Sequence, residues 1–293
     1  MISFIIPYCT YNEKDPINLS PWIDTDNSRI EMTTIAAIRN INKVHKFKKE
    51  IILVDNSNTF PKVSIPNLKV VKGWQYLPIS KIKKQKNFKK YKIDNFNTLS
   101  MWVSMAYNVG LQHAKGDYIV LQHNDIFYHN SFIFELIHDT IVYDQKYISA
   151  DAKKLHISTY IQNKELFDKY LKEVKFRPFD GGYVKTRDLY FADCYFFLAK
   201  KDFFDDYYVD WKYGDSNHGA TLRCLENGWK YEHLEPFHDN PNFSRYRSHK
   251  LHTYKYKSQD FITHLKGGFS EHKMTKKEYG PYYYEFMKLF ENG

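Results

Sequence analysis

The sequence predicts an α/β fold in which helices flank a mostly parallel central sheet. Short apolar runs, typical of strands that are buried on both faces, recur along the first half of the chain. Segments with apolar residues at helical spacing lie between these runs, so strand and helix alternate through residue 125. The chain has 293 residues, of which 43% are hydrophobic and 18% aromatic. This composition suits a large core in one sizeable domain with an appendage.

Each predicted element follows from apolar spacing and from the residues that begin or end it. Pro7 closes the first strand, Ser28 and Glu31 form a capping box at the start of the first helix, and Gly228 ends the last core helix. We predict strands at 2–6, 51–54, 68–71, 118–121, 191–199 and 230–234, and helices at 28–41, 99–113, 131–142, 216–228 and 282–290.

The sequence shows no sign of a membrane span, a secretory signal or a disulfide framework. No apolar run approaches the roughly eighteen residues that a span needs, and the start of the chain lacks a basic segment followed by a long apolar stretch. The three cysteines, Cys9, Cys194 and Cys224, are far apart and lack metal-ligand spacing. We therefore expect a cytoplasmic protein that begins at Met1.

A formal charge of +9 admits nucleic acid, an anionic membrane surface or a phosphate-bearing ligand as partner. Much of the excess lies in the segment 81–92, which begins at Lys81, ends at Lys92 and holds seven lysines and two aromatic residues. Such a segment could bind single-stranded nucleic acid, but two aromatic residues make a thin stacking platform. A mobile loop that closes on an anionic ligand is the simpler interpretation.

Polar residues follow the predicted strand 118–121 at once. The segment 122–125 therefore falls just past the carboxyl end of a central strand, where open α/β sheets bind their ligands. Asp125 ends this segment and is the first candidate site residue.

The residues around Asp125 resemble the centre of the inverting GT-A glycosyltransferases of family 2. The resemblance is carried by Asn108, Gly110, Ala114, Gly116, Asp117, Tyr118, Ile119 and Asp125. In that family the strand ends in a DxD-like triplet, whose last Asp holds the divalent metal that bridges the diphosphate of the donor. Here the triplet is His123, Asn124 and Asp125, with His in place of the first acid.

The same resemblance implies a set of donor-binding residues. Family-2 enzymes have a turn like P-x-Y-N-E after the first strand, and an Asp at the end of the second strand that reads the base; Asp55 is in the latter place. The turn's register leaves open which of Tyr8, Thr10 and Tyr11 contacts the nucleotide. Asp193 could accept hydrogen bonds from sugar hydroxyls or simply end a strand. The implied donor-binding residues are Pro7, Tyr8, Thr10, Asp55, Asn108, His123, Asn124 and Asp193.

The resemblance also assigns the base and a second metal ligand. Tyr213, Gly214 and Asp215 match the start of the family's acidic motif, whose carboxylate deprotonates the acceptor, whereas the next acidic position is Ser216. Asp215 is therefore the expected general base, although it could also cap the following helix. His238 follows the last core strand, where the family often has a metal-binding His, and with Asp125 it would hold Mn²⁺ or Mg²⁺.

Together these features predict a GT-A glycosyltransferase domain at 1–240 and a helical or irregular extension at 241–293 that packs on the acceptor side. The implied reaction is inverting transfer of a sugar from a nucleotide-sugar, UDP-linked, to a glycan or protein-linked glycan acceptor. Because two acids of the family pattern are replaced, a nucleotide-sugar or glycan-binding protein without turnover is an alternative. An RNA-binding module that uses the lysine-rich segment is a second alternative, although no nucleic-acid partner is expected.

Overall fold

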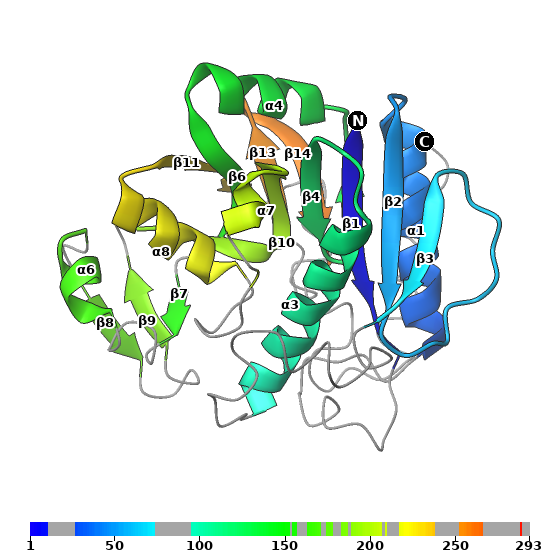
Figure 1. Cartoon of the computed structure of the whole chain (residues 1–293), viewed down its shortest axis with the longest axis horizontal. Helices are drawn as coiled ribbons and strands as arrows, with labels where there is room; N and C mark the ends of the chain where they lie inside the picture. Colours follow the sequence, from blue (N-terminus) through cyan, green and yellow to red (C-terminus); the bar gives the residue numbers. More distant parts are fainter. Residues whose placement is uncertain are drawn as a thin grey trace.

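The structure is a computed structural model of the chain, shown in Figure 1. It describes residues 1–10, 27–73, 95–152, 154–156, 163–170, 174–177, 183–186, 189–206, 209, 217–237, 252–265 and 288. The fold is mixed α/β, as predicted.

A seven-stranded sheet forms the centre of the molecule. Its strands, in spatial order, are β11 (Lys230–His233), β6 (Gln145–Ala152), β10 (Phe191–Lys200), β4 (Tyr118–Gln122), β1 (Ile2–Tyr8), β2 (Lys49–Asp55) and β3 (Leu68–Lys72). The four strands from β4 to β3 are parallel, and so are β11 and β6. β10 runs antiparallel to both of its neighbours, β4 and β6. The carboxyl ends of β4, β1 and β2 consequently meet at one edge of the sheet, the lower edge in Figure 1.

Helices cover both faces of this sheet (Figure 1). The helices are α1 (Asn27–Val44), α3 (Asn95–His113), α4 (Ile133–Val142), α6 (Lys164–Asp168), α7 (Phe203–Asp206) and α8 (His218–Asn227). Of these, α6 lies to one side of the sheet, at the left of Figure 1. Alternate residues of β1 divide between two core clusters: Phe4 joins the cluster of α1 and α4, and Ile5 joins that of α3 and α8. This alternation explains why β1 is apolar without a break, since both of its faces are buried.

A second sheet packs beside the first and contributes to the site. Its strand order is β12 (Glu235–Phe237), β13 (His252–Tyr256), β14 (Gln259–His264) and β5 (Ile126–Tyr128), and all its pairs are antiparallel. A third sheet is formed by β7 (Lys154–His156), β9 (Tyr183–Thr186) and β8 (Val174–Arg177). The predicted division at residue 240 stays a prediction, but β14 lies beyond it and pairs with β5, which lies well before it.

The long predicted elements correspond to β1, β2, β3, β4, β10, β11, α1, α3, α4 and α8, within a few residues at each end. Gly228 ends α8 in the left-handed conformation (φ +65°), as its place in the sequence predicts. β6 and the hairpin of β13 and β14 were not predicted. The lysine-rich segment 81–92 lies outside the described residues, and so does the predicted helix 282–290 apart from residue 288. None of the described helices is long and apolar enough to cross a bilayer.

Candidate metal site at the carboxyl edge of the sheet

Two segments that are far apart in the chain meet beside the end of β4. His123 and Asp125 lie in the short turn between β4 and β5, and His264 is the last residue of β14. The antiparallel ladder sets His264 opposite Ile126. The ladder is extended by the amide of Leu265, which donates a hydrogen bond to the Asp125 carbonyl over 3.2 Å. Strand register therefore fixes the position of His264 beside Asp125.

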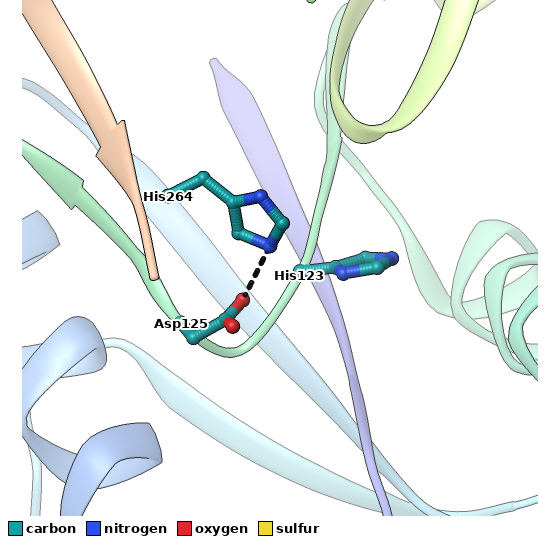
Figure 2. A group of neighbouring side chains, drawn as sticks. All are labelled: His123, Asp125 and His264. Carbon is teal, nitrogen blue, oxygen red and sulfur yellow. Dashed lines mark ion pairs between the residues drawn. The ribbon is translucent and has the colours of Figure 1, made fainter. Parts of the chain in front are cut away.

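Figure 2 shows the ring of His264 facing the carboxylate of Asp125, with the ring of His123 to one side of this pair. One potential ligand atom from each residue lies within 4.8 Å of those from the other two. The Nε2 atom of His264 is 3.2 Å from Oδ1 of Asp125. His264 is 1% exposed and Asp125 is 9% exposed, whereas His123 is half-buried. This group is called the metal triad below.

The metal triad fits a divalent cation. Among the described residues, neither Oδ1 of Asp125 nor Nε2 of His264 makes a hydrogen bond of good geometry, although both atoms are buried. Buried polar atoms are normally satisfied, so such a pair calls for another partner. A shared ion with ligands at 2.0–2.2 Å would hold neighbouring ligand atoms about 3–4 Å apart. The observed spacing therefore requires only a small contraction, which the half-buried His123 can supply.

The charge state of Asp125 is also suited to a cation. Burial alone would raise the pKa of this carboxyl, but the neighbouring imidazoles of His264 and His123 outweigh burial and lower the pKa below its usual value. The carboxylate is therefore ionised near neutral pH and available as a ligand.

A tyrosine from β10 contacts both histidines of the metal triad. The amide of His123 donates a hydrogen bond to the carbonyl oxygen of Tyr195 over 3.1 Å. The Tyr195 ring lies against the ring of His264, with 3.9 Å between centroids, and meets the ring of His123 edge-on at 5.2 Å. Neither Tyr195 nor His264 was among the residues predicted to form the site.

Asn124 and Asp55 make structural contacts at the same edge of the sheet. Asn124 donates to the hydroxyl of Thr34 over 2.8 Å. The Asp55 carboxylate ends β2 and accepts hydrogen bonds from the amide and hydroxyl of Ser57, both 3.0 Å, and from the amide of Phe60, 2.9 Å. Asp55 thus fixes the turn after β2, and its proposed contact with a nucleotide base stays a prediction.

The residues after β1 join the same turn through a group of hydroxyls. The amide of Thr10 donates to the hydroxyl of Ser57 over 3.1 Å, and the hydroxyl of Thr59 lies within hydrogen-bond distance of both Thr10 and Ser57. Pro7 and Tyr8 form the end of β1, and the buried ring of Tyr8 packs edge-on against Phe60. Two predicted donor-binding segments, at the ends of β1 and β2, are therefore brought together.

Asn108 has a structural position in α3. Its side-chain amide donates to the carbonyls of Ser104 and Val209, over 2.9 and 2.7 Å, and its carbonyl accepts from the Val209 amide over 3.2 Å. Gly110 is needed because a Cβ atom there would lie 2.2 Å from the Ile5 side chain. Two residues of the motif that carries the family resemblance thus have structural contacts: Gly110 packs α3 on β1, and Asn108 joins α3 to the main chain of Val209.

Three predicted site residues cannot be placed at this site. Asp215 and His238 lie outside the described residues. Asp193 lies in β10, next to a shift in the register of β10 against β6 between Ala192 and Phe197. His264 was missed because it ends a short strand in a tail that is rich in polar residues; the apolar pair Phe261 and Ile262 before it was the available signal.

No protein-family model and no curated protein sequence matches the chain. Among solved structures it is similar to the bifunctional IspDF of Campylobacter jejuni (10% identity, TM-score 0.43, 81% of this chain and 50% of that one). It is also similar to the mannosyltransferase PcManGT of Pyrobaculum calidifontis in complex with GDP-Man and Mn²⁺ (12% identity, TM-score 0.41, 79% of this chain and 53% of that one). A third similar structure is mouse xyloside xylosyltransferase 1 (11% identity, TM-score 0.45, 80% of this chain and 85% of that one). The matches span about half the length of the first two proteins.

Proposed function

We propose that the protein is a metal-dependent glycosyltransferase that moves a sugar from a nucleotide-sugar donor, UDP-linked, to an acceptor hydroxyl with inversion. The observation that carries this proposal is the convergence of His123, Asp125 and His264 at the carboxyl edge of the sheet. The triplet that supplies two of these residues resembles the diphosphate-binding centre of GT-A enzymes. Open α/β sheets bind their ligands at such an edge.

The metal triad favours Mn²⁺ over Mg²⁺. Two imidazoles and one carboxylate suit a transition-metal ion, whereas Mg²⁺ prefers oxygen ligands and retains several waters. His123, Asp125 and His264 would hold three coordination positions and leave the others for diphosphate oxygens and water. When bound, the ion would neutralise the charge that develops on the departing diphosphate.

The remaining steps belong to other residues of the chain. Asp215 is proposed to take the proton of the acceptor hydroxyl. Asp55 is proposed to accept a hydrogen bond from a ring N–H of the base. Each carboxylate oxygen can accept more than one hydrogen bond, and in the contacts described above Oδ2 accepts one, from the Phe60 amide. The lysine-rich segment 81–92 is proposed to close over the diphosphate, and His238 remains a candidate further ligand.

A binding and turnover experiment tests the proposal. Chelator-treated protein is titrated with UDP in the presence of Mn²⁺ or Mg²⁺, and hydrolysis of a panel of UDP-sugars is followed because it needs no known acceptor. We expect UDP binding and slow hydrolysis that depend on Mn²⁺ more than on Mg²⁺. Asp125→Asn should abolish the metal dependence, whereas His138→Ala, at an exposed position on α4, should leave it unchanged.

The alternatives give different results in the same experiment. Metal-dependent UDP binding with neither hydrolysis of the donor nor transfer to an acceptor would identify a nucleotide-sugar-binding protein that lacks turnover. Salt-sensitive RNA retention without UDP binding would support the RNA-binding module. Equal UDP affinity of Asp125→Asn and the parent, with the same response to metal, would refute the metal site.

A further inference from the structure

We propose that Tyr195 is a positioning residue that holds both imidazoles of the metal triad and so sets the affinity of the site for its ion. This inference rests on the proposed metal site. β10 supplies none of the metal triad's three side chains. Through Tyr195 it would nevertheless set the orientation of both histidines, which reach the site from the ends of β4 and β14.

The first contact is made by the backbone. β10 and β4 pair antiparallel with Phe196 opposite Gln122, and the hydrogen bond from the His123 amide to the Tyr195 carbonyl continues this ladder by one residue. The main chain of His123 is therefore held even though β4 itself ends at Gln122. Any side chain at position 195 can preserve this contact, since it uses only the carbonyl.

The second contact is made by the ring. Tyr195 lies against His264 with 33° between the ring planes and stands nearly perpendicular, at 78°, to the ring of His123. The two imidazoles are themselves 5.5 Å apart at 78°. Each of the three rings thus contacts the other two, and removing the Tyr195 ring would take one ring contact from each imidazole.

The local backbone explains how this tyrosine reaches the histidines. The register of β10 against β6 shifts between Ala192 and Phe197, and Tyr195 lies inside the shifted segment. Irregularities of this kind bend a strand and change the direction of a side chain, and they are common next to active sites. Tyr195 is half-buried, whereas Phe196 and Phe197 after it are fully buried in the two core clusters.

Holding the rings in place should matter for metal binding. A metal-bound histidine usually owes its orientation to a hydrogen-bond partner of its other ring nitrogen, and removing that partner typically costs 10–100-fold in metal affinity. Nδ1 of His264 has no hydrogen-bond partner among the residues that the structure describes. The Tyr195 ring lies closer to the His264 ring (3.9 Å between centroids) than the His123 ring does (5.5 Å), so packing against Tyr195 takes the place of such a partner in restraining the plane of this ring. We expect the loss of the ring to weaken metal binding by about tenfold or more.

The test compares Tyr195→Phe, Tyr195→Leu and Tyr195→Ala in the full chain. Calorimetry measures the Mn²⁺ affinity, and electron paramagnetic resonance measures the symmetry of the bound ion. Thermal unfolding in the presence of a chelator measures the stability of each metal-free variant. Tyr195→Phe keeps the ring and should bind Mn²⁺ within about threefold of the parent. Tyr195→Leu and Tyr195→Ala should lose about tenfold or more and give a broadened spectrum. Tyr190→Ala is the matched control, because Tyr190 contacts His233, which is outside the metal triad.

The outcomes separate this inference from the proposed site. No Mn²⁺ binding by the parent would refute the metal site itself. Parent-like affinity and spectra for both Tyr195→Leu and Tyr195→Ala, with binding lost in His264→Ala, would refute the role of Tyr195 and keep the site. A loss of affinity in Tyr195→Leu that matches its loss of thermal stability, together with an equal loss in Tyr190→Ala, would reduce Tyr195 to a general packing residue.

Discussion

The imidazole of His264 and the carboxylate of Asp125 face one another at 3.2 Å inside the protein without the geometry of a hydrogen bond. They belong to adjoining parts of one antiparallel ladder, because Asp125 immediately precedes β5 and His264 ends the strand that pairs with β5. The pairing of β5 with β14 therefore brings together in space two candidate ligands that lie far apart in the chain.

His264→Ala should weaken Mn²⁺ binding by more than the roughly 10–100-fold typical of an outer-shell partner, because a ligand of the metal triad is itself lost while Asp125 keeps its charge. Equilibrium dialysis against Mn²⁺ measures the change. His252→Ala serves as the control, since His252 pairs with His264 across the hairpin and is not a member of the metal triad. Equal weakening by the two substitutions would show that hairpin integrity, rather than ligation, is being measured.

Asp215→Asn should lower transfer to an acceptor about 10²–10⁴-fold while donor affinity stays unchanged, because a general base acts on the acceptor and not on the donor. The measurement is a single-turnover transfer assay beside a UDP binding isotherm. Once an acceptor is known, unchanged transfer by the variant would remove Asp215 from the proposed mechanism and leave Asp193 as the next carboxylate to test.

Asn108→Ala should destabilise the fold by about 1–3 kcal/mol, because both backbone groups of Val209 would lose their side-chain partner in a buried place. Urea unfolding measures this free energy. The affinity for UDP of the folded variant should be unchanged, since the amide is engaged within the protein. A stable variant with reduced UDP affinity would instead support the nucleotide contact that the sequence motif implies.

His45 should make the protein less stable as the pH falls. Burial, with a smaller contribution from Lys49, lowers the pKa of this imidazole from 6.5 to about 3. Between these two values the unfolded chain binds a proton that the folded chain does not, so the free energy of unfolding falls by up to about 1.4 kcal/mol per pH unit below pH 6.5. Above pH 6.5 the imidazole is neutral in both states and has no effect.

The His45 prediction is checked by urea unfolding of the parent and His45→Phe between pH 7.5 and 5. Phenylalanine suits the site, because His45 lies among the rings of Phe4, Phe47 and Tyr128. The parent should lose stability more steeply than His45→Phe below pH 6.5. Parallel curves for the parent and His45→Phe would contradict the prediction.

The sequence predicts β1, β2 and β4 well, because strands buried on both faces leave an unbroken apolar run. β6 escapes this rule: it mixes polar and apolar residues, so its sequence (QKYISADA) matches neither strand template, although Tyr147 and Ile148 are buried. The antiparallel direction of β10 could not be predicted either, since side-chain alternation is the same in both directions.

The candidate site could be predicted only in part, for a similar reason. Asp125 lies next to an apolar strand and is therefore visible as a strand-end carboxylate. His264 becomes a candidate ligand only through the register between β14 and β5, which places it beside Asp125 and depends on contacts between distant segments. Asp55 and Asn108 show the converse, because residue type and spacing cannot tell a side chain that binds a ligand from one that fixes its own backbone.

The pairing of β14 with β5 has a thermodynamic consequence. An ion that binds His123, Asp125 and His264 together can do so only while β14 lies against β5, so every opening that separates the two strands must first release it. The free energy of such an opening would rise with ion concentration by RT ln(1 + [ion]/Kd). Amide hydrogen exchange along residues 259–264 would then slow as Mn²⁺ is added, and the pairing of β14 with β5 would report the occupancy of the site.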